Sequence, residues 1–375
     1  HVYTWLARSI AQMEYADLTD RRSDRDRAFF GAPAHEALRR GHGPYLSVSG
    51  SITGTPHWGE HWESSQVGLG KWGETCASAY LMRLCGKMAE WEPLPSHFDL
   101  YERVMYNAFF SAQSEDGGKY RYFTPFNERA EWWDRDTYCC PNNYKRMVFE
   151  IPDSVVRRAG DGLAVCLYAP TELKSGGYVV KMATAYPESG TVTLSVTMPE
   201  GEKSLFLRIP KWCASAVLEM DGVTKNVTSG WLQVRRNFAK GISIKLEMPM
   251  PIRLVKGCRA QEGRVAVMRG PCVYALERKI NGLQVHGIDL WDLDVAKPLT
   301  WRAEKHAVEA GIRFRHRSRE ERTVLLTRFF REERERTYFD PTGPCDAVED
   351  EVAPPCGRVV RAGREKDVAH TGGEN

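Results

Sequence analysis

The spacing of hydrophobic residues divides the chain into two parts. Up to about residue 150, apolar side chains recur every three or four positions, which is the period of an α-helix that packs on one face. Three segments carry this pattern most clearly, and we expect helices over residues 1–20, 74–91 and 98–112. From about residue 163 the period changes to two, which is typical of β-strands. The sequence therefore predicts a helical part followed by a sheet-rich part, with a boundary near residue 150.

The sheet-rich part shows the alternation in three runs. Apolar and polar side chains alternate over residues 191–198 and 242–248, and apolar residues also recur at every second position over 205–209. The dipeptide Asp221-Gly222 lies between two such runs and is typical of a two-residue β-hairpin. Because many short strands at this spacing are typical of an antiparallel β-sandwich, we expect that architecture over residues 151–340.

Three segments lack a clear periodic pattern. Residues 21–45 are rich in Arg and Asp and then in Gly and Pro, so we expect a loop there. Residues 46–73 combine Trp, His and Gly, and a long loop of this kind often carries function. Residues 341–375 are rich in Gly, Pro and charge with almost no apolar pattern, and we expect this tail to be disordered.

Composition narrows the classes of protein further. The chain has 375 residues with 52 basic and 49 acidic side chains, a balance that argues against a nucleic-acid-binding protein. No stretch approaches the roughly 20 apolar residues of a membrane span, so we expect no membrane partner either. Most of the ten cysteines lie in apolar runs, as buried free thiols do, and we therefore expect a reducing, cytoplasmic location.

Four residues form the most informative chemical pattern. Cys139 and Cys140 are adjacent, and adjacent cysteines rarely form a disulfide because the ring would be strained. Glu74 and Cys76 lie about sixty residues upstream, and they can share an ion only at a helix entrance, since residues two apart do not face each other within a helix. Three thiols and one carboxylate suit a soft divalent ion such as zinc. Closed Cys-rich sites are usually structural, so both a structural and a catalytic role stay open.

Glu60 is a second candidate for chemistry. It lies in the run HWGEHW over residues 57–62, where Trp58 and Trp62 flank it. Burial against indole rings would raise the pKa of this carboxyl toward the range of a general acid, and tryptophans suit the C–H faces of sugars. The alternative is a loop glutamate that is hydrogen-bonded to its neighbours. The two histidines of the run lack the glutamate placement of a His-Glu-x-x-His zinc motif, so we do not expect a second metal site.

Together these motifs resemble the β-L-arabinofuranosidases of glycoside hydrolase family 127. The matching pieces are SITG (51–54), GEHW (59–62), GETCASAY (73–80), YER and YNA (101–103 and 106–108), CCPNN (139–143), GRVA (263–266), RGP (269–271) and VY (273–274). The Glu-x-Cys plus Cys-Cys combination is the specific part of the resemblance, which covers about residues 1–340.

The resemblance implies a fold and a domain organisation. It implies an (α/α)6-barrel catalytic domain, of which residues 1–150 would be the C-terminal part, followed by an antiparallel β-sandwich over residues 151–340. About 150 residues are too few for six helical hairpins, so we expect an N-terminally truncated member of the family.

The resemblance also implies residue roles. Members of the family are glycosidases that retain the configuration of the anomeric carbon. Their nucleophile is the first cysteine of the pair, which corresponds to Cys139, and their general acid/base is a glutamate that corresponds to Glu60. His1 matches a substrate-contacting histidine, and we expect Trp58 and Trp62 to contact the sugar as well. The implied cofactor is zinc, held by Glu74, Cys76, Cys139 and Cys140.

The leading hypothesis is therefore a zinc-dependent retaining glycosidase that releases L-arabinofuranose or a similar plant-derived sugar. One alternative is a related (α/α)-barrel glycosidase with another sugar specificity. Another is a non-catalytic carbohydrate-binding protein with a structural zinc. All three take a carbohydrate as partner, and a homodimer stays open.

Overall fold

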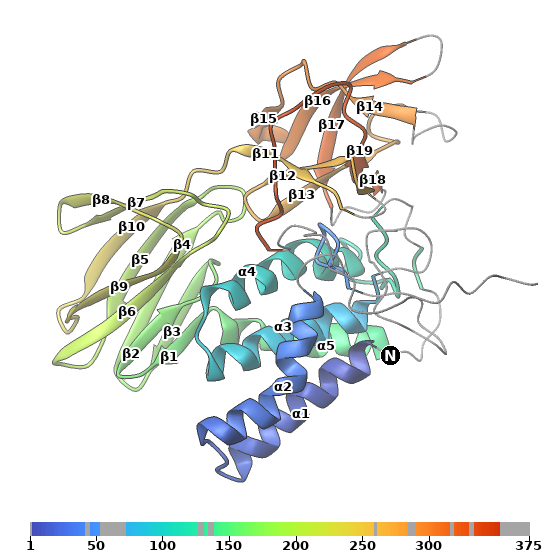
Figure 1. The fold of residues 1–375 in the computed structure, drawn as a ribbon. Coiled ribbons are helices and arrows are strands. Elements are labelled where there is room, and N and C mark those ends of the chain that lie inside the picture. The colour runs from blue at the N-terminus through green and yellow to red at the C-terminus, as the bar shows by residue number, and fades with distance from the viewer. Residues whose placement is uncertain are drawn as a thin grey trace, which may run out of the picture.

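A computed structural model describes residues 2–41, 46–52, 73–126, 131–133, 139–258, 261–283, 290–315, 319–329 and 334–352. Helices occupy the first part of the chain and strands the second (Figure 1). This mixed, multidomain architecture with a sheet-rich C-terminal part confirms the division that the change of hydrophobic period predicts.

The described first part contains helices that surround one central helix. Their bounds are α1 (Val2–Leu18), α2 (Asp24–Gly41), α3 (Thr75–Trp91), α4 (Pro95–Val104), the π-helical turn η1 (Met105–Phe109), the 3-10 turn η2 (Phe110–Ala112), α5 (Cys139–Glu150) and the 3-10 turn η3 (Pro152–Ser154). Helix α3 packs against α1, α4 and α5. The three helices predicted from periodicity are confirmed. None of the helices in the described ranges has the length and apolar character that crossing a bilayer requires.

Helix α2 corrects the prediction of a loop over residues 21–45. Its first turn is stabilised by Ser23, whose Oγ accepts the backbone N–H of Asp26 at 3.1 Å and donates to the Asp26 carboxylate at 2.6 Å. This reciprocal pairing resembles a capping box and marks the start of a helix. The loop prediction was wrong because it rested on the overall composition of the segment and not on this local start signal.

Packing explains why the helix continues through Pro33. A proline inside a helix costs about 3 kcal/mol, because it removes a hydrogen bond and crowds the preceding turn. Three side chains of α2 offset this cost by joining the buried hydrophobic cluster to which α1 contributes: Ala34, Ala37 and Leu38.

The strands of the described second part form three sheets. The four-stranded sheet has the order β1 (Val156–Ala159), β2 (Gly162–Val165), β6 (Glu202–Ile209) and β9 (Gly230–Asn237). The six-stranded sheet has the order β3 (Thr171–Ser175), β4 (Tyr178–Thr184), β5 (Thr191–Thr197), β10 (Ile242–Glu247), β7 (Ala216–Met220) and β8 (Val223–Val227). These two sheets lie together on one side of the helices in Figure 1.

The third sheet has ten strands and lies apart from the other two (Figure 1). Its main path is β14 (Trp291–Leu293), β16 (Ala307–Phe314), β17 (Glu321–Arg328), β13 (Cys272–Glu277), β12 (Val265–Arg269), β11 (Ile252–Lys256) and β20 (Ala347–Val348). Three short strands pair beside this path: β15 (Thr300–Arg302), β18 (Arg334–Arg336) and β19 (Tyr338–Phe339). A 3-10 turn, η6 (Ala303–Lys305), follows β15.

The local strand predictions are confirmed. Burial alternates along β5 and β10, and the two strands pair antiparallel. Asp221 and Gly222 connect β7 to β8 with positive φ angles of 53° and 74°, as a two-residue hairpin turn requires. The expectation of purely antiparallel pairing is wrong, because β2 pairs parallel with β6 and β11 pairs parallel with β20.

The start of the expected disordered tail is ordered instead. Strand β20 pairs with β11, and the acidic residues that follow bind Arg103 of α4. Asp350 and Glu351 lie 3.0 Å and 2.7 Å from its guanidinium nitrogens, and Arg103 is only 1% exposed. A buried guanidinium is stable only when it is paired and hydrogen-bonded. Pairing with Arg103 therefore holds the segment with Asp350 and Glu351 in place, although this segment has almost no apolar pattern. Residues 353–375 lie outside the described residues.

Candidate metal centre

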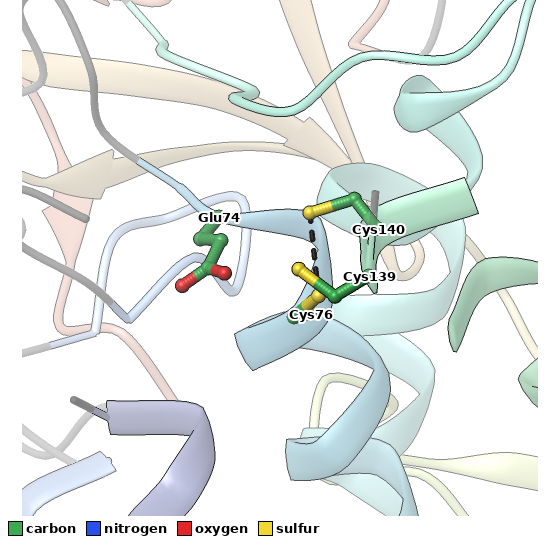
Figure 2. Close-up of side chains that lie close together, drawn as sticks. All are labelled: Glu74, Cys76, Cys139 and Cys140. Atoms are coloured by element: carbon green, nitrogen blue, oxygen red, sulfur yellow. Dashed lines mark hydrogen bonds between the residues drawn. The ribbon is translucent and has the colours of Figure 1, made fainter. Parts of the chain in front are cut away.

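Glu74, Cys76, Cys139 and Cys140 meet where α3 and α5 begin (Figure 2). One ligand atom from each residue lies within 4.8 Å of the others. The Sγ atoms of Cys76 and Cys140 are 3.3 Å apart. The fold therefore brings together the two motifs that the sequence separates.

Glu74 and Cys76 can face the same point because the backbone turns between them. Glu74 is the N-cap of α3 and has extended backbone angles, whereas Cys76 lies in the first helical turn. The segment before α3 is held by pairing, in which the backbone N–H of Thr75 donates to the carbonyl of Tyr122 at 3.0 Å. The condition that these two residues share an ion only at a helix entrance is therefore met.

Gly73 is required for this turn. Its φ of +72° lies in the region that favours glycine. A Cβ at this position would lie 2.8 Å from both Ser51 Oγ and Thr124 Oγ1, which is too close for a real contact. The glycine of the Gly-Glu-Thr-Cys motif thus allows the backbone to place the Glu74 carboxylate beside the thiols.

Cys139 and Cys140 occupy the first two positions of α5. The positive end of a helix dipole favours thiolates at such positions. Side chains further along α5 hold the helix in place: Tyr144 stacks on Phe109 at 4.3 Å between ring centroids, and Glu150 forms a bidentate ion pair with Arg83 of α3. The first contact holds α5 against η1 and the second holds it against α3, which helps to set the spacing between the two ligand pairs.

Burial and hydrogen bonding distinguish Cys139 from the other two thiols. Cys76 and Cys140 are 0% and 1% exposed, whereas Cys139 is half-buried. Hydrogen bonds from Cys140 and then Cys76 lower the pKa of Cys139 to about 3. The pKa values of Cys76 and Cys140 are raised, chiefly because each donates its hydrogen to the Cys139 sulfur. Both exposure and hydrogen bonding therefore favour Cys139 as the reactive thiol of the three.

The donor set fits a soft divalent cation. Three sulfur atoms and a carboxylate group lie close enough to share one ion, and Glu74 is fully buried beside them. Sulfur-rich sets with one carboxylate match zinc rather than magnesium or calcium, which take oxygen ligands. A cation here would also neutralise the charge that the cluster buries.

Three further residues surround the cluster, and the sequence analysis missed them. Asn143 donates from Nδ2 to Cys76 Sγ at 3.2 Å, and its position three residues after Cys140 was a usable signal, since such residues share a helix face. Tyr122 hydrogen-bonds to Cys139, and burial raises the pKa of its own hydroxyl. Burial also raises the pKa of Tyr3 on α1, as does the nearby Cys139. No local pattern marks either tyrosine, because both reach the cluster through the tertiary fold.

Four predicted site residues lie outside the part of the chain that the structure describes. Glu60, Trp58 and Trp62 fall within 53–72 and, like His1, lie outside the described residues. The structure thus brings together all four predicted metal ligands, and the predicted acid/base and sugar contacts stay predictions.

Comparison of the sequence with known protein families places the chain in a class of carbohydrate-active proteins. The sequence profile described as the beta-L-arabinofuranosidase GH127 catalytic domain matches residues 46–153, and that of the GH127 middle domain matches residues 162–250. The chain belongs to glycoside hydrolase family 127.

Individual relatives agree with this assignment. A non-reducing end β-L-arabinofuranosidase of Bifidobacterium longum subsp. longum is 27% identical over 286 residues, which cover 68% of this chain and 42% of that protein. The chain therefore spans less than half the length of this relative.

Solved structures share the fold. A GH127 β-L-arabinofuranosidase from Geobacillus stearothermophilus T6 superposes with a TM-score of 0.73 at 23% identity, covering 91% of this chain and 60% of that one. The GH127 β-arabinofuranosidase BT3674 gives a TM-score of 0.72 at 22% identity, with 88% and 57% coverage.

Proposed function

We propose that this protein acts as a retaining glycoside hydrolase that releases terminal L-arabinofuranose or a similar plant-derived sugar, with Cys139 as nucleophile. One observation carries the proposal: among the three clustered thiols, Cys139 alone is partly exposed, and it lies at the first position of α5, where hydrogen bonds from the other thiols lower its pKa. A reactive thiol must be ionised and reachable, and Cys139 meets both conditions. The names of the Bifidobacterium and Geobacillus relatives, both β-L-arabinofuranosidases, support the sugar.

In the first step, the Cys139 thiolate attacks the anomeric carbon and a C–S bond forms as the glycosidic C–O bond breaks. Glu60 gives its proton to the departing oxygen. In the second step, Glu60 removes a proton from water, the water oxygen attacks the same carbon, and the C–S bond breaks to restore the thiolate. Two displacements at one carbon retain its configuration. The part played by Glu60 rests on the sequence resemblance.

The residues that would hold zinc are Glu74, Cys76, Cys139 and Cys140. Such an ion, when bound, supplies positive charge that keeps the coordinating sulfurs ionised. The protein itself contributes the dipole of α5 and the fixed spacing of α3 and α5, which hold the Cys139 sulfur at one position. Tyr122 adds a hydrogen bond to the same sulfur.

We also propose a domain organisation for this function. The helices α1–α5 would belong to an (α/α)6-barrel catalytic domain within residues 1–150, and residues 151–340 would form β-sandwich domains. Shared buried side chains support close packing of these parts, because one hydrophobic cluster includes residues from the helices and from all three sheets.

The test is hydrolysis of an aryl β-L-arabinofuranoside by the full-length protein. Cys139→Ser and Glu60→Gln should each lower kcat by at least about a thousandfold, as loss of a nucleophile or acid/base does. Cys345→Ser, which changes a partly buried thiol outside the cluster, should retain activity. Mass spectrometry of a slowly hydrolysed substrate complex should place one arabinosyl group on the peptide that contains Cys139.

Each other outcome is informative. Full activity of Cys139→Ser would show that the thiol is not the nucleophile. A protein that binds zinc and sugar without turnover would favour the non-catalytic carbohydrate-binding alternative. Cleavage of a different aryl glycoside in a panel would favour the related glycosidase of other specificity.

A further inference from the structure

Asn143 links the two halves of the thiol cluster. It lies on α5, one turn after the cysteine pair, yet its side-chain amide reaches Cys76 on α3, where Nδ2 donates to Sγ at 3.2 Å. The residue is 5% exposed and Cys76 is fully buried, so water does not compete freely for this contact. The hydrogen bond therefore ties the first turn of α3 to the first turn of α5.

We propose that Asn143 is a positioning residue that orients the Cys76 sulfur as a metal ligand. The inference does not depend on Cys139 being the nucleophile of the proposed function. An N–H group that points at a sulfur fixes the direction of that ligand, as outer partners of metal ligands generally do.

The chemistry of an amide suits this position. A neutral donor adds no charge to a cluster that already holds a carboxylate and three ionisable thiols. An aspartate of the same shape would bring another negative charge to Cys76 instead of a donor. A leucine of similar volume would fill the space without any hydrogen bond. Asn143→Leu and Asn143→Asp therefore separate hydrogen bonding from packing.

The first measurement is zinc affinity by competition with a chromophoric chelator. Loss of an outer partner of a ligand typically weakens affinity about 10–100-fold, and we expect a loss in that range for Asn143→Leu and at least as large for Asn143→Asp. Asn142→Ala, a change at the exposed neighbouring position, should bind zinc like the wild type. Thermal unfolding of each variant reports whether it is folded, and Asn143→Ala takes the place of a variant that fails to fold.

The second measurement is the rate of alkylation by iodoacetamide at each cysteine, read by peptide mass spectrometry of metal-free protein. In the wild type, Cys139 should be modified before Cys76. In Asn143→Leu, the rate at Cys76 should fall further below that at Cys139, because the Cys76 sulfur loses a donor that favours the reactive thiolate. These readouts differ from those expected for simple packing, which Leu would preserve.

The outcomes separate the two proposals. If Asn143→Leu binds zinc like the wild type and leaves the relative rates of alkylation unchanged, Asn143 is not a positioning residue, even if Cys139 proves essential for hydrolysis. If zinc affinity falls and Cys76 becomes less reactive, the positioning role stands, even if Cys139→Ser keeps its activity and the proposed function fails.

Discussion

Arg208 joins the sheets to the helices that carry the candidate site, and its replacement gives a quantitative prediction. The guanidinium of this β6 residue is fully buried and donates to Asp99 at 2.6 Å and to Glu102 at 2.8 Å, both on α4. It also donates to the backbone carbonyl of Cys166 at 2.6 Å. In Arg208→Met a side chain of similar length fills the space, but two buried carboxylates and one carbonyl lose their strongest donor.

Breaking a buried ion pair in this way costs about 3–5 kcal/mol, because the carboxylates that are left cannot recover water. Three remaining contacts limit the loss. Tyr186 and Trp212 Nε1 donate to Glu102 at 2.7 Å and 3.4 Å. The backbone N–H of Lys211 donates to Asp99 at 3.2 Å. We therefore expect the free energy of unfolding at pH 7 to fall by an amount within that range rather than above it.

The assay is urea unfolding at pH 7, followed by both tryptophan fluorescence and far-UV circular dichroism because several domains are present. Arg235→Met is the matched control on neighbouring strand β9, since Arg235 pairs with Glu202 at 3.3 Å and both side chains are more than half exposed. This control should lose less than about 1 kcal/mol. If Arg208→Met also loses less than about 1 kcal/mol, the buried network does not hold the two parts together and the reasoning is refuted.

Two further predictions concern Gly73 and Asp99. Gly73→Ala should lower the free energy of unfolding by about 1–3 kcal/mol and lower the zinc content, because φ of +72° and contacts of 2.8 Å exclude a Cβ. Gly86→Ala on α3 is the control, since its Cβ would lie 3.9 Å from the nearest atom, and it should retain both stability and zinc. Equal behaviour of the two variants would contradict the argument. Burial raises the pKa of Asp99 from 3.8 to about 6, so the folded state favours the protonated carboxyl. This contribution to the free energy of unfolding is complete below pH 3.8 and is lost as the pH rises through 6. Relative to Asp99→Asn, the wild type should therefore lose up to about 3 kcal/mol between pH 4 and pH 7 in chemical unfolding, and parallel pH profiles would disprove this assignment.

Local patterns in the sequence predicted much of the secondary structure. The apolar stripes of α1 and α3, the alternation along β5 and β10, and the Asp221-Gly222 turn all follow from backbone geometry over a few residues. Such patterns are visible in a sequence because the period of an element decides which of its side chains share a face. The ligand types of the metal centre were predicted in the same way, from the chemistry of carboxylate and sulfur.

Long-range packing overturned or supplied the rest. Helix α2 forms despite Pro33 because its apolar side chains pack in the cluster shared with α1, and the segment with Asp350 and Glu351 is ordered because it binds the buried Arg103. Neither outcome can be inferred from composition, which reports average preference rather than specific partners.

The sequence by itself determined the elements and the kinds of atoms available to bind a metal. Only the tertiary structure decided that Cys76 and Cys140 lie 3.3 Å apart, that Cys139 is the thiol left accessible, and that Asn143 reaches Cys76. The physical reason is that a contact between distant segments depends on the sum of many weak interactions along α3, α5 and the loops between them, whereas a helical or strand period depends only on near neighbours.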